Sequence, residues 1–425
     1  MDNSEIRRRQ QKRRIDRKKR QERQKKLRRR LFWGSAAAVL LAALVITVFL
    51  LADYINQPPA PGEDTPGQTS PQASQEQTVI NLAFGGDLNV TDKVITAGSA
   101  GDGYDYTDIF TDILPLLAGA DGSAVNFEGN LCGAPYGTQD TRAPQALADA
   151  LSDAGVDYLQ MANSCALNNG LLGLQSTLEN IRKAGLEPVG AFADKSDFTK
   201  HKGFTLRSIH GVKVAFVAFT KGMDSLSLPA GSEDCVNLLY TDYTSTYQDV
   251  DTEGITKILK DVAAEKPDVT VALVHWGSEY NRQISGTQEK IAKLMQQQGV
   301  DAIIGTHSHY VQKLSYDPKA GTVVAYSLGD FLGDGEKSGT AYSIVLNLEF
   351  TKNNATGETK LTDCRWDPIY TTSFENDGVA RMQILQIRPA IARYEADGIN
   401  KVSEETYTAM KSALSKLEAT LSEEE

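Results

Sequence analysis

The chain has 425 residues and a formal net charge of −11, but the charge is divided unevenly along its length. Residues 1–30 hold 16 Lys and Arg against 4 Asp and Glu, whereas the remaining 395 residues hold 28 basic and 51 acidic side chains. A hydrophobic content of 41% with 35 scattered glycines excludes a fibrous or collagen-like chain and indicates a globular one.

An uncharged stretch from Leu31 to Ala52 follows the basic residues directly. Its 22 residues would span roughly 33 Å as a helix, which is enough to cross a bilayer and argues against a purely cytosolic protein. Because the basic flank precedes it and Asp53 follows it, the positive-inside rule predicts a cytoplasmic N-terminus and an extracellular main domain. A cleaved signal peptide is the alternative, but its apolar region is normally shorter. We expect an uncleaved, single-pass signal anchor.

The basic segment at residues 1–30 could instead bind nucleic acid or anionic lipid. Its position against the apolar stretch favours a topogenic, lipid-facing role, so we expect the bilayer as its partner and no nucleic acid. Residues 53–77 then predict a disordered or partly extended linker, because they lack large apolar residues and contain Pro58, Pro59, Pro61, Pro66 and Pro71.

A globular domain is expected at residues 78–393, and it opens with three strand-helix units. The strands are expected at Val79–Phe84, Ala124–Phe127 and Tyr158–Met161. The helices have apolar faces formed by Ile109, Phe110, Ile113, Leu116 and Leu117, by Leu147, Ala150, Leu151 and Ala154, and by Leu171, Leu174, Leu178 and Ile181. This rhythm predicts βαβ crossovers and a mainly parallel sheet.

The second half of the domain begins with an expected β-hairpin. Its strands, Phe204–Ile209 and Val212–Phe219, are joined by His210-Gly211. After a polar excursion we expect helices at 255–263 and 288–298, strands at 269–274 and 302–305, and antiparallel strands at 311–316, 323–327, 342–350 and 361–366. This mixture predicts two packed sheets with helices outside.

The C-terminal segment at residues 394–425 predicts an amphipathic helix, because apolar side chains recur at Tyr407, Met410, Leu414, Leu417 and Leu421. This helix either docks on the domain or pairs with another copy.

Polar residues stand where the expected strands end, which is where ligands bind in parallel α/β sheets. Three of the five histidines are among them. The residues are Asp87 after Gly85-Gly86, Asn126 and Glu128, Asn163, His275, and the pair His307 and His309.

Oxygen and imidazole ligands of this kind suit Mn, Fe or Zn. Two such ions could coordinate a phosphoryl oxygen and activate water. Taken singly, each residue has a structural explanation: an Asp after Gly-Gly is often a turn or helix cap, and a His beside Trp is often a packing residue. The His-x-His pair is a stronger signal, because alternate strand positions aim both rings the same way. Together the residues predict a polar functional pocket that binds divalent metal.

These motifs resemble the poly-γ-glutamate capsule synthesis proteins of the CapA type. The resemblance covers roughly residues 80–335 and includes His275-Trp-Gly-x-Glu279-Tyr280 and Tyr326-Ser-Leu-Gly-Asp-Phe331. It implies a calcineurin-like metallophosphatase fold, a four-layer α/β/β/α sandwich. It also implies a bacterial cell-surface protein that works on an anionic capsule polymer beside a membrane synthase or transporter.

The resemblance also assigns residues by position. It implies that the metal or substrate ligands are Asp87, Glu128, Asn163, His275, His307 and His309, and that the three histidines carry any catalysis. Asn126, Glu279 and Asp330 are expected to line the same pocket.

This chain departs from the family where the family usually reads Asn-Asn-His-x-x-Asp. Here Cys165 replaces the His and Asn168 replaces the Asp. In related phosphoesterases that His resembles a general acid or a transition-state stabiliser, and the acidic residue is well placed to orient it. The joint replacement puts ordinary phosphoester hydrolysis in doubt even if metal still binds. A second departure is Asp330, where the family more often has Asn.

Four cysteines in an extracellular domain permit two disulfides. We hypothesise a bridge between Cys132 and Cys165 at the rim of the pocket, which leaves Cys235 and Cys364 as a second pair. The competing interpretation makes Cys165 a free thiol that acts as a nucleophile or soft ligand.

Two classes of function remain open. One is a metal-dependent hydrolase or transferase acting on a phosphorylated or polyanionic cell-envelope substrate, and the other is a non-catalytic surface component that binds or guides the polymer. An acidic domain repels an anionic polymer over about 8 Å, so binding requires cations or a local basic patch. No Walker-type loop, GxSxG elbow or Rossmann glycine fingerprint is seen in a suitable context, which argues against nucleotide and serine-hydrolase chemistry.

Overall fold

The structure is a computed structural model that describes residues 77–376, 378–397 and 402–422. Within these ranges no helix has both the length and the apolar character needed to span a bilayer. The expected basic segment, the anchor at 31–52 and nearly all of the linker at 53–77 lie outside the described residues.

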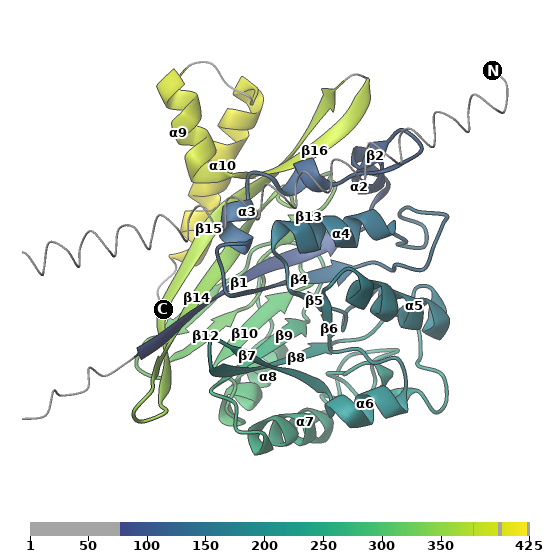
Figure 1. The fold of residues 1–425 in the computed structure, drawn as a ribbon, viewed down its shortest axis with the longest axis vertical. Coiled ribbons are helices and arrows are strands. Elements are labelled where there is room, and N and C mark those ends of the chain that lie inside the picture. Colours follow the sequence, from purple (N-terminus) through teal and green to yellow (C-terminus); the bar gives the residue numbers. More distant parts are fainter. Residues whose placement is uncertain (1–76, 377, 398–401, 423–425) are drawn as a thin grey trace, which may run out of the picture. The chain divides into compact units, whose positions relative to one another are not determined.

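Eight strands form the first sheet. They are β1 (Gln77–Asn89), β4 (Gly122–Glu128), β5 (Tyr158–Gln160), β6 (Glu187–Val189), β13 (Asp330–Leu332), β14 (Tyr342–Asn353), β15 (Thr359–Asn376) and β16 (Val379–Gln386). Their order is β16-β15-β14-β1-β4-β5-β6, and β13 pairs with β1 outside this order. The strands β1, β4, β5 and β6 are parallel, as the βαβ pattern predicts, whereas β14, β15 and β16 add antiparallel pairs (Figure 1).

Six strands form the second sheet. They are β7 (Phe204–Ile209), β8 (Val212–Thr220), β9 (Val269–His275), β10 (Ala302–Thr306), β11 (Leu314–Asp317) and β12 (Thr322–Ala325), in the order β11-β12-β10-β9-β8-β7. The predicted hairpin of β7 and β8 is confirmed. The expectation that the strands after residue 310 are all antiparallel is wrong for β12, which pairs with β10 in parallel. A short hairpin, β2 (Ser99–Ala100) with β3 (Gly103–Tyr104), stands apart from both sheets.

Helices connect the strands and cover the sheets. They are α2 (Asp92–Ala97), α3 (Leu114–Leu117), α4 (Gln145–Ala154), α5 (Gly170–Lys183), α6 (Lys195–His201), α7 (Thr252–Ala264), α8 (Gly286–Gln297), α9 (Ile387–Asp397), α10 (Glu404–Leu421) and the 3₁₀ turns η1 (Thr107–Phe110) and η2 (Glu233–Cys235). The single helix expected around 109–117 is wrong. The chain forms η1 and α3 instead, with Pro115 in the first turn of α3, and still buries Ile109, Phe110 and Leu117.

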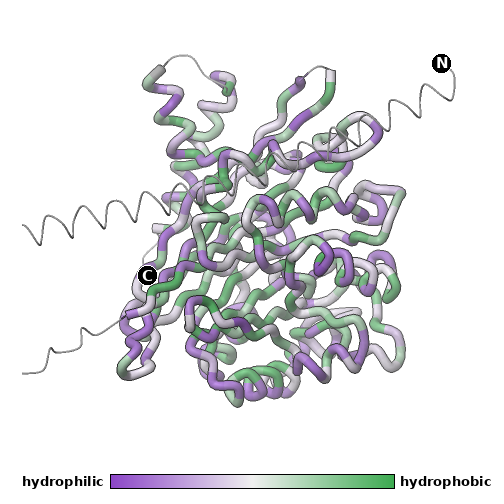
Figure 2. The backbone as a smooth tube through the Cα atoms, in the orientation of Figure 1, coloured by the Kyte–Doolittle hydropathy of each residue, from purple (hydrophilic) through white to green (hydrophobic). Residues whose placement is uncertain are grey.

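The second sheet is buried on both faces, as the alternation along β8 shows. Val214 and Phe216 belong to a core shared with the first sheet, whereas Ala215 and Val217 belong to a second core with α7 and α8. The order of layers is therefore helices, sheet, sheet, helices, with α4 above the first sheet and α7 below the second in Figure 1. Figure 2 shows hydrophobic residues along the central strands.

The C-terminal helix α10 docks on the globular domain. Met410, Ala413 and Leu417 are buried in the core that contains the first sheet, so the docked alternative holds in this structure. The expected domain boundary at residue 393 falls within α9.

Candidate metal centre

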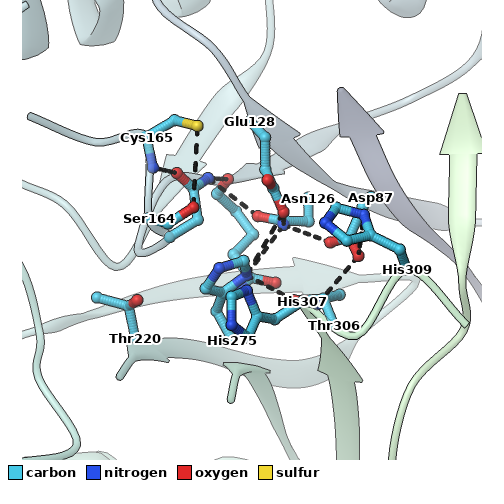
Figure 3. Close-up of polar contacts among 12 residues, drawn as sticks. Asp87, Asn126, Glu128, Ser164, Cys165, Thr220, His275, Thr306, His307 and His309 are labelled. Atoms are coloured by element: carbon cyan, nitrogen blue, oxygen red, sulfur yellow. Dashed lines mark hydrogen bonds and ion pairs between the residues drawn. The ribbon is translucent and has the colours of Figure 1, made fainter. Parts of the chain in front are cut away.

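The carboxyl ends of parallel strands from both sheets bring the polar side chains together. Asp87 lies near the end of β1, Glu128 ends β4, His275 ends β9, and His307 and His309 directly follow β10. All of these residues are buried. The strand ends thus form one polar cluster between two hydrophobic sheets (Figure 3).

Two groups of possible ligands meet at Asp87. One group is Asp87, Glu128 and His275, and the other is Asp87, His309 and Asp330. Within each group the ligand atoms all lie within 4.8 Å of one another. Asp87 belongs to both groups, so it is the carboxylate that two neighbouring cations would share.

The position of Asp330 depends on a close backbone approach. Residues 328–330 run beside the end of β1, where the Asp87 N–H donates to Gly329 O at 2.9 Å and Asp87 and Asp330 are register partners. A Cβ on Gly86 would lie 1.8 Å from Gly329 O, so only glycine permits this approach. The Gly-Gly-Asp motif therefore brings the second carboxylate to the site.

Two asparagines hold the carboxylates in place. Asn126 Nδ2 donates to Asp87 Oδ1 at 2.6 Å and to Glu128 Oε1 at 3.0 Å, and it lies 3.3 Å from His275 Nδ1. Asn163 Nδ2 donates to Asn126 Oδ1 at 3.0 Å, and its own Oδ1 accepts from the Cys165 N–H. Asn163 therefore orients Asn126, and its oxygen, which the family resemblance makes a metal ligand, is used within the protein.

The histidines of the second sheet present free nitrogen atoms. His275 Nδ1 lies 3.2 Å from Thr306 Oγ1, whereas His275 Nε2 and His307 Nδ1 are buried and have no hydrogen-bond partner among the described residues. The centroids of the two rings are 4.4 Å apart, and the backbone N–H of His307 donates to Asp87 Oδ2 at 3.0 Å. Buried imidazole nitrogens without a hydrogen-bond partner are suited to binding a divalent metal.

The predicted reason for the His-x-His pair is wrong. The strand β10 ends at Thr306, and the two histidines lie in a turn where His307 has φ 93° and His309 has φ 59°. Positive φ is costly for residues other than glycine, and such strain concentrates at functional sites. The turn, rather than strand alternation, brings the two rings to 6.5 Å from each other.

The residues of the cluster differ in the charge that they carry without a metal, and His309 and Asp330 favour the charged forms. Burial alone lowers the pKa of His309, but its hydrogen bond to Asp330 at 2.8 Å and the nearby carboxylates outweigh this and raise the pKa to about 10. Burial raises the pKa of Asp330 to about 6 despite His309. Without a metal, His309 and Asp330 are thus an ion pair at neutral pH, and Tyr280 stacks on His309 at 4.9 Å.

At Glu128, His275 and His307, in contrast, burial favours the uncharged forms. Burial raises the pKa of Glu128 well above its usual value, and the charge of Asp87 adds to this. Burial lowers the pKa of His275 and His307 well below the usual value. Neutral imidazoles are the form that binds metal, so these histidines are ready to act as ligands at neutral pH.

The two residues that depart from the family meet at Thr141. The Cys165 thiol contacts Ser164 Oγ at 3.9 Å and is hydrogen-bonded with Thr141, and Asn168 Nδ2 donates to Thr141 Oγ1 at 3.1 Å. Burial raises the pKa of Cys165 well above its usual value, and the charge of Glu128 adds to this. A neutral buried thiol is a poor nucleophile and a poor metal ligand.

Neither hypothesised disulfide forms, because all four cysteines are free thiols. Cys364 lies on β15, and Cys235 O accepts from Phe192 just beyond β6. These strands are five positions apart in the first sheet, which is roughly 24 Å at the usual strand spacing. Cys132 lies beside Gly173 of α5, whereas the Cys165 thiol is engaged by Ser164 and Thr141.

Of the expected pocket residues, Asn126 and Asp330 join the cluster, whereas Glu279 does not. Glu279 is exposed, and its charge acts on Lys221 and Asp224. The sequence prediction misses Lys221, whose Nζ lies 3.5 Å from His307 Nε2. Burial lowers the pKa of Lys221, against the charges of Glu279 and Asp224. The strand-end rule could have found Lys221, because it directly follows the apolar run of β8.

Comparison with known proteins identifies relatives of this chain. Residues 81–335 match the family described as "Bacterial capsule synthesis protein PGA_cap". The capsule biosynthesis protein CapA of Bacillus anthracis is 30% identical over 263 residues, which cover 59% of this chain and 59% of that protein. The PGA biosynthesis protein CapA of Bacillus subtilis is 26% identical over 298 residues, which cover 67% of this chain and 71% of that protein.

Solved structures with some likeness include phosphoesterases. A novel phosphatase of Mycoplasma pneumoniae has 17% identity and a TM-score of 0.41, covering 69% of this chain and 95% of its own. The calcineurin-like phosphoesterase YfkN of Bacillus subtilis has 16% identity and a TM-score of 0.41, covering 80% of this chain and 98% of its own.

Proposed function

This chain belongs to the bacterial capsule synthesis protein family, and from that premise we propose that it acts in the synthesis or export of an anionic capsule polymer, poly-γ-glutamate or a similar one. The protein is a single-pass membrane protein whose main domain is extracellular. The uneven distribution of charge along the chain supports this topology, since 16 basic residues precede the uncharged stretch from Leu31 to Ala52. Its partners are the bilayer, the polymer and the membrane synthase or transporter that makes or moves the polymer.

The buried cluster is a site for divalent metal, with Mn, Fe or Zn as the candidates. The observation that carries this proposal is the position of Asp87 in two ligand groups. The ligands are Asp87, Glu128 and His275 for one ion and Asp87, His309 and Asp330 for the other. Two sheets with helices outside them are consistent with a calcineurin-like α/β/β/α sandwich, in which a metal pair polarises phosphoryl oxygens and activates water.

The chain's own residues prepare this site. Asn126 holds Asp87 and Glu128 through its amide group, and Asn163 holds Asn126 in turn. The surrounding side chains exclude bulk water, because the ligand residues have relative exposures of at most 6%. Such positioning strengthens the electrostatic interactions of an anionic group that reaches the centre.

A role in binding or guiding the polymer is favoured over hydrolysis. Cys165 stands where the family usually has a histidine, and its thiol is buried with a raised pKa, so it is a poor proton donor at neutral pH. The site can therefore hold an anionic group without an obvious residue to protonate a leaving group.

The second candidate function is a metal-dependent phosphoesterase or hydrolase that acts on a cell-envelope substrate. The specific observation that favours it is that both ligand groups are complete despite the loss of the histidine. In this case leaving-group protonation falls to another group or to water.

The test combines metal analysis with assays on the purified full-length protein in detergent. We expect bound Mn, Fe or Zn in the wild type and little in Asp87→Ala, together with loss of polymer production in cells that carry Asp87→Ala. Turnover of a phosphodiester or of polyglutamate by the loaded protein would favour the enzyme. Absence of metal together with normal polymer production by Asp87→Ala would refute a role for the centre.

A further inference from the structure

Lys221 is a cation fixed at the edge of the metal centre. It directly follows Thr220, the last residue of β8, and Thr220 is the register partner of His275 on β9. The Lys221 N–H donates to His275 O at 2.8 Å. The backbone of Lys221 is thus tied to a residue of one ligand group.

The side chain of Lys221 is held by three groups. Its Nζ donates to Gly277 O at 2.9 Å, lies 3.5 Å from His307 Nε2, and stands 4.5 Å above the centre of the Tyr247 ring. The neighbouring Gly222 makes this possible, because a Cβ there would lie 2.9 Å from the Tyr247 ring. The ring of Tyr247 can therefore approach and orient the ammonium group.

These hydrogen-bond partners leave the charge of Lys221 without a close carboxylate. They are a carbonyl oxygen and an imidazole nitrogen, and the carboxylates of Glu279 and Asp224 act only through their charge. An ammonium group has three donors. Gly277 O uses one, and the donor that faces His307 Nε2 becomes available when this nitrogen is engaged elsewhere.

The surroundings of this cation are acidic. Three carboxylates, Asp87, Glu128 and Asp330, form the centre itself, and the chain beyond residue 30 carries 51 acidic against 28 basic side chains. An anionic substrate is repelled by this domain unless a local positive group receives it. Lys221 is a positive group held beside His307, at the edge of the two ligand groups.

We propose that Lys221 is the anion-binding residue of this centre, donating a hydrogen bond to an oxygen of the phosphoryl or carboxylate group of the substrate. The inference deepens the proposed function and rests on it, because it requires that the cluster binds metal. A lysine suits this task, since its ammonium group acts as a compact point charge toward oxyanions.

Binding measurements on the full-length protein, loaded with Mn²⁺ in detergent, test this role. The probes are inorganic phosphate and a short γ-linked glutamate oligomer, titrated by calorimetry into the wild type, Lys221→Met, Lys221→Arg and Lys213→Met. Lys213 is a matched control, because it lies on β8, the strand that Lys221 directly follows, its Nζ also donates to a backbone carbonyl, and it is roughly 26 Å away along the strand direction.

We expect Lys221→Met to weaken the binding of at least one probe by about 10- to 100-fold while Mn²⁺ content stays unchanged. Lys221→Arg should retain most of the affinity, and Lys213→Met should match the wild type. A loss for phosphate alone identifies a phosphoryl group as the substrate oxyanion, and a loss for the oligomer alone identifies a carboxylate.

Three results would overturn the inference. Unchanged affinity for both probes in Lys221→Met with normal Mn²⁺ content excludes Lys221 as the anion-binding residue. The proposed metal centre is not affected by this result. An equal loss in Lys213→Met, or a loss of Mn²⁺ in Lys221→Met, shows general electrostatics or a structural role instead. Failure of the wild type to bind Mn²⁺, Fe²⁺ or Zn²⁺ overturns the proposed metal centre and this inference together.

Discussion

The first sheet supplies the carboxylates of the candidate metal centre, and the second sheet supplies its imidazoles. Asp87, Glu128 and Asp330 lie on β1, β4 and β13, whereas His275 ends β9 and His309 follows β10. Each ligand group takes its acids from one sheet and its imidazole from the other. Neither sheet holds a complete group, so the site exists only where the two sheets are packed together.

Asp87→Ala should have the largest effect, because it removes the carboxylate that both groups share. Taking one partner out of a buried charged cluster costs about 3 to 5 kcal/mol, so we expect metal affinity to fall by about 1000-fold. Metal content after dialysis against a chelator at graded concentrations measures this.

A substitution that affects only one of the two ligand groups tests whether each group binds its own ion. His275→Ala removes the imidazole of only one group and should leave about half of the metal bound. Asp121→Asn is the control, because Asp121 accepts from the Asn81 N–H near the start of β1 and lies outside both groups. Equal metal content in Asp87→Ala and the wild type would contradict the shared-ligand arrangement.

The double change Cys165→His with Asn168→Asp restores the residues that the family usually has. A positioned general acid typically contributes at least about 100-fold to rate, so turnover of a phosphodiester by the metal-loaded protein should rise by that factor. Steady-state kinetics with a chromogenic phosphodiester provide the measurement, and Cys165→His alone tests whether the acidic partner is needed. No gain in the double variant, with metal still bound, would show that the missing histidine is not what limits hydrolysis.

Metal should stabilise the packing of the two sheets, since it binds ligands from both. At a free concentration 100 times the dissociation constant, we expect each bound ion to raise the free energy of unfolding by about 2.7 kcal/mol. Denaturant unfolding with and without Mn²⁺ measures the gain, and Asp87→Ala should lose it. A similar gain in Asp87→Ala would place the stabilising ions elsewhere.

The pH dependence of metal affinity is the smallest expected effect. Burial raises the pKa of Glu128 well above its usual value, so in the metal-free protein this group holds a proton at pH values where an ordinary glutamate has lost it. Metal must displace that proton, so the affinity of the group that contains Glu128 should rise with pH by about tenfold per unit below the raised pKa. Calorimetry in buffers with different ionisation enthalpies counts the protons released, and an affinity independent of pH between 5 and 7 would contradict the expectation.

The strand-end rule predicted most of the site, because apolar runs mark strands and a polar residue directly after such a run marks its end. Asp87, Glu128, His275, His307 and His309 all follow from this rule, and the structure brings them into one cluster, with His307 against His275 but in neither ligand group.

The remaining features depend on contacts that local patterns do not encode. Asp330 reaches Asp87 through β13, a three-residue strand with no pattern of its own. Pro115 divides an apparently continuous apolar face into η1 and α3. The disulfide hypothesis failed because it treated cysteines as near one another without knowing which strands separate them.

The hydrogen bond from the His307 N–H to Asp87 joins residues 220 positions apart in the chain. During synthesis from the N-terminus, β1 and β4 are therefore complete long before the histidines and Asp330 have been made. The cluster cannot assemble before the chain has been made as far as Asp330. Under the proposed topology, a domain exported unfolded would take its metal from the compartment in which folding finishes, so the supply of ions there would decide how much of the protein is loaded.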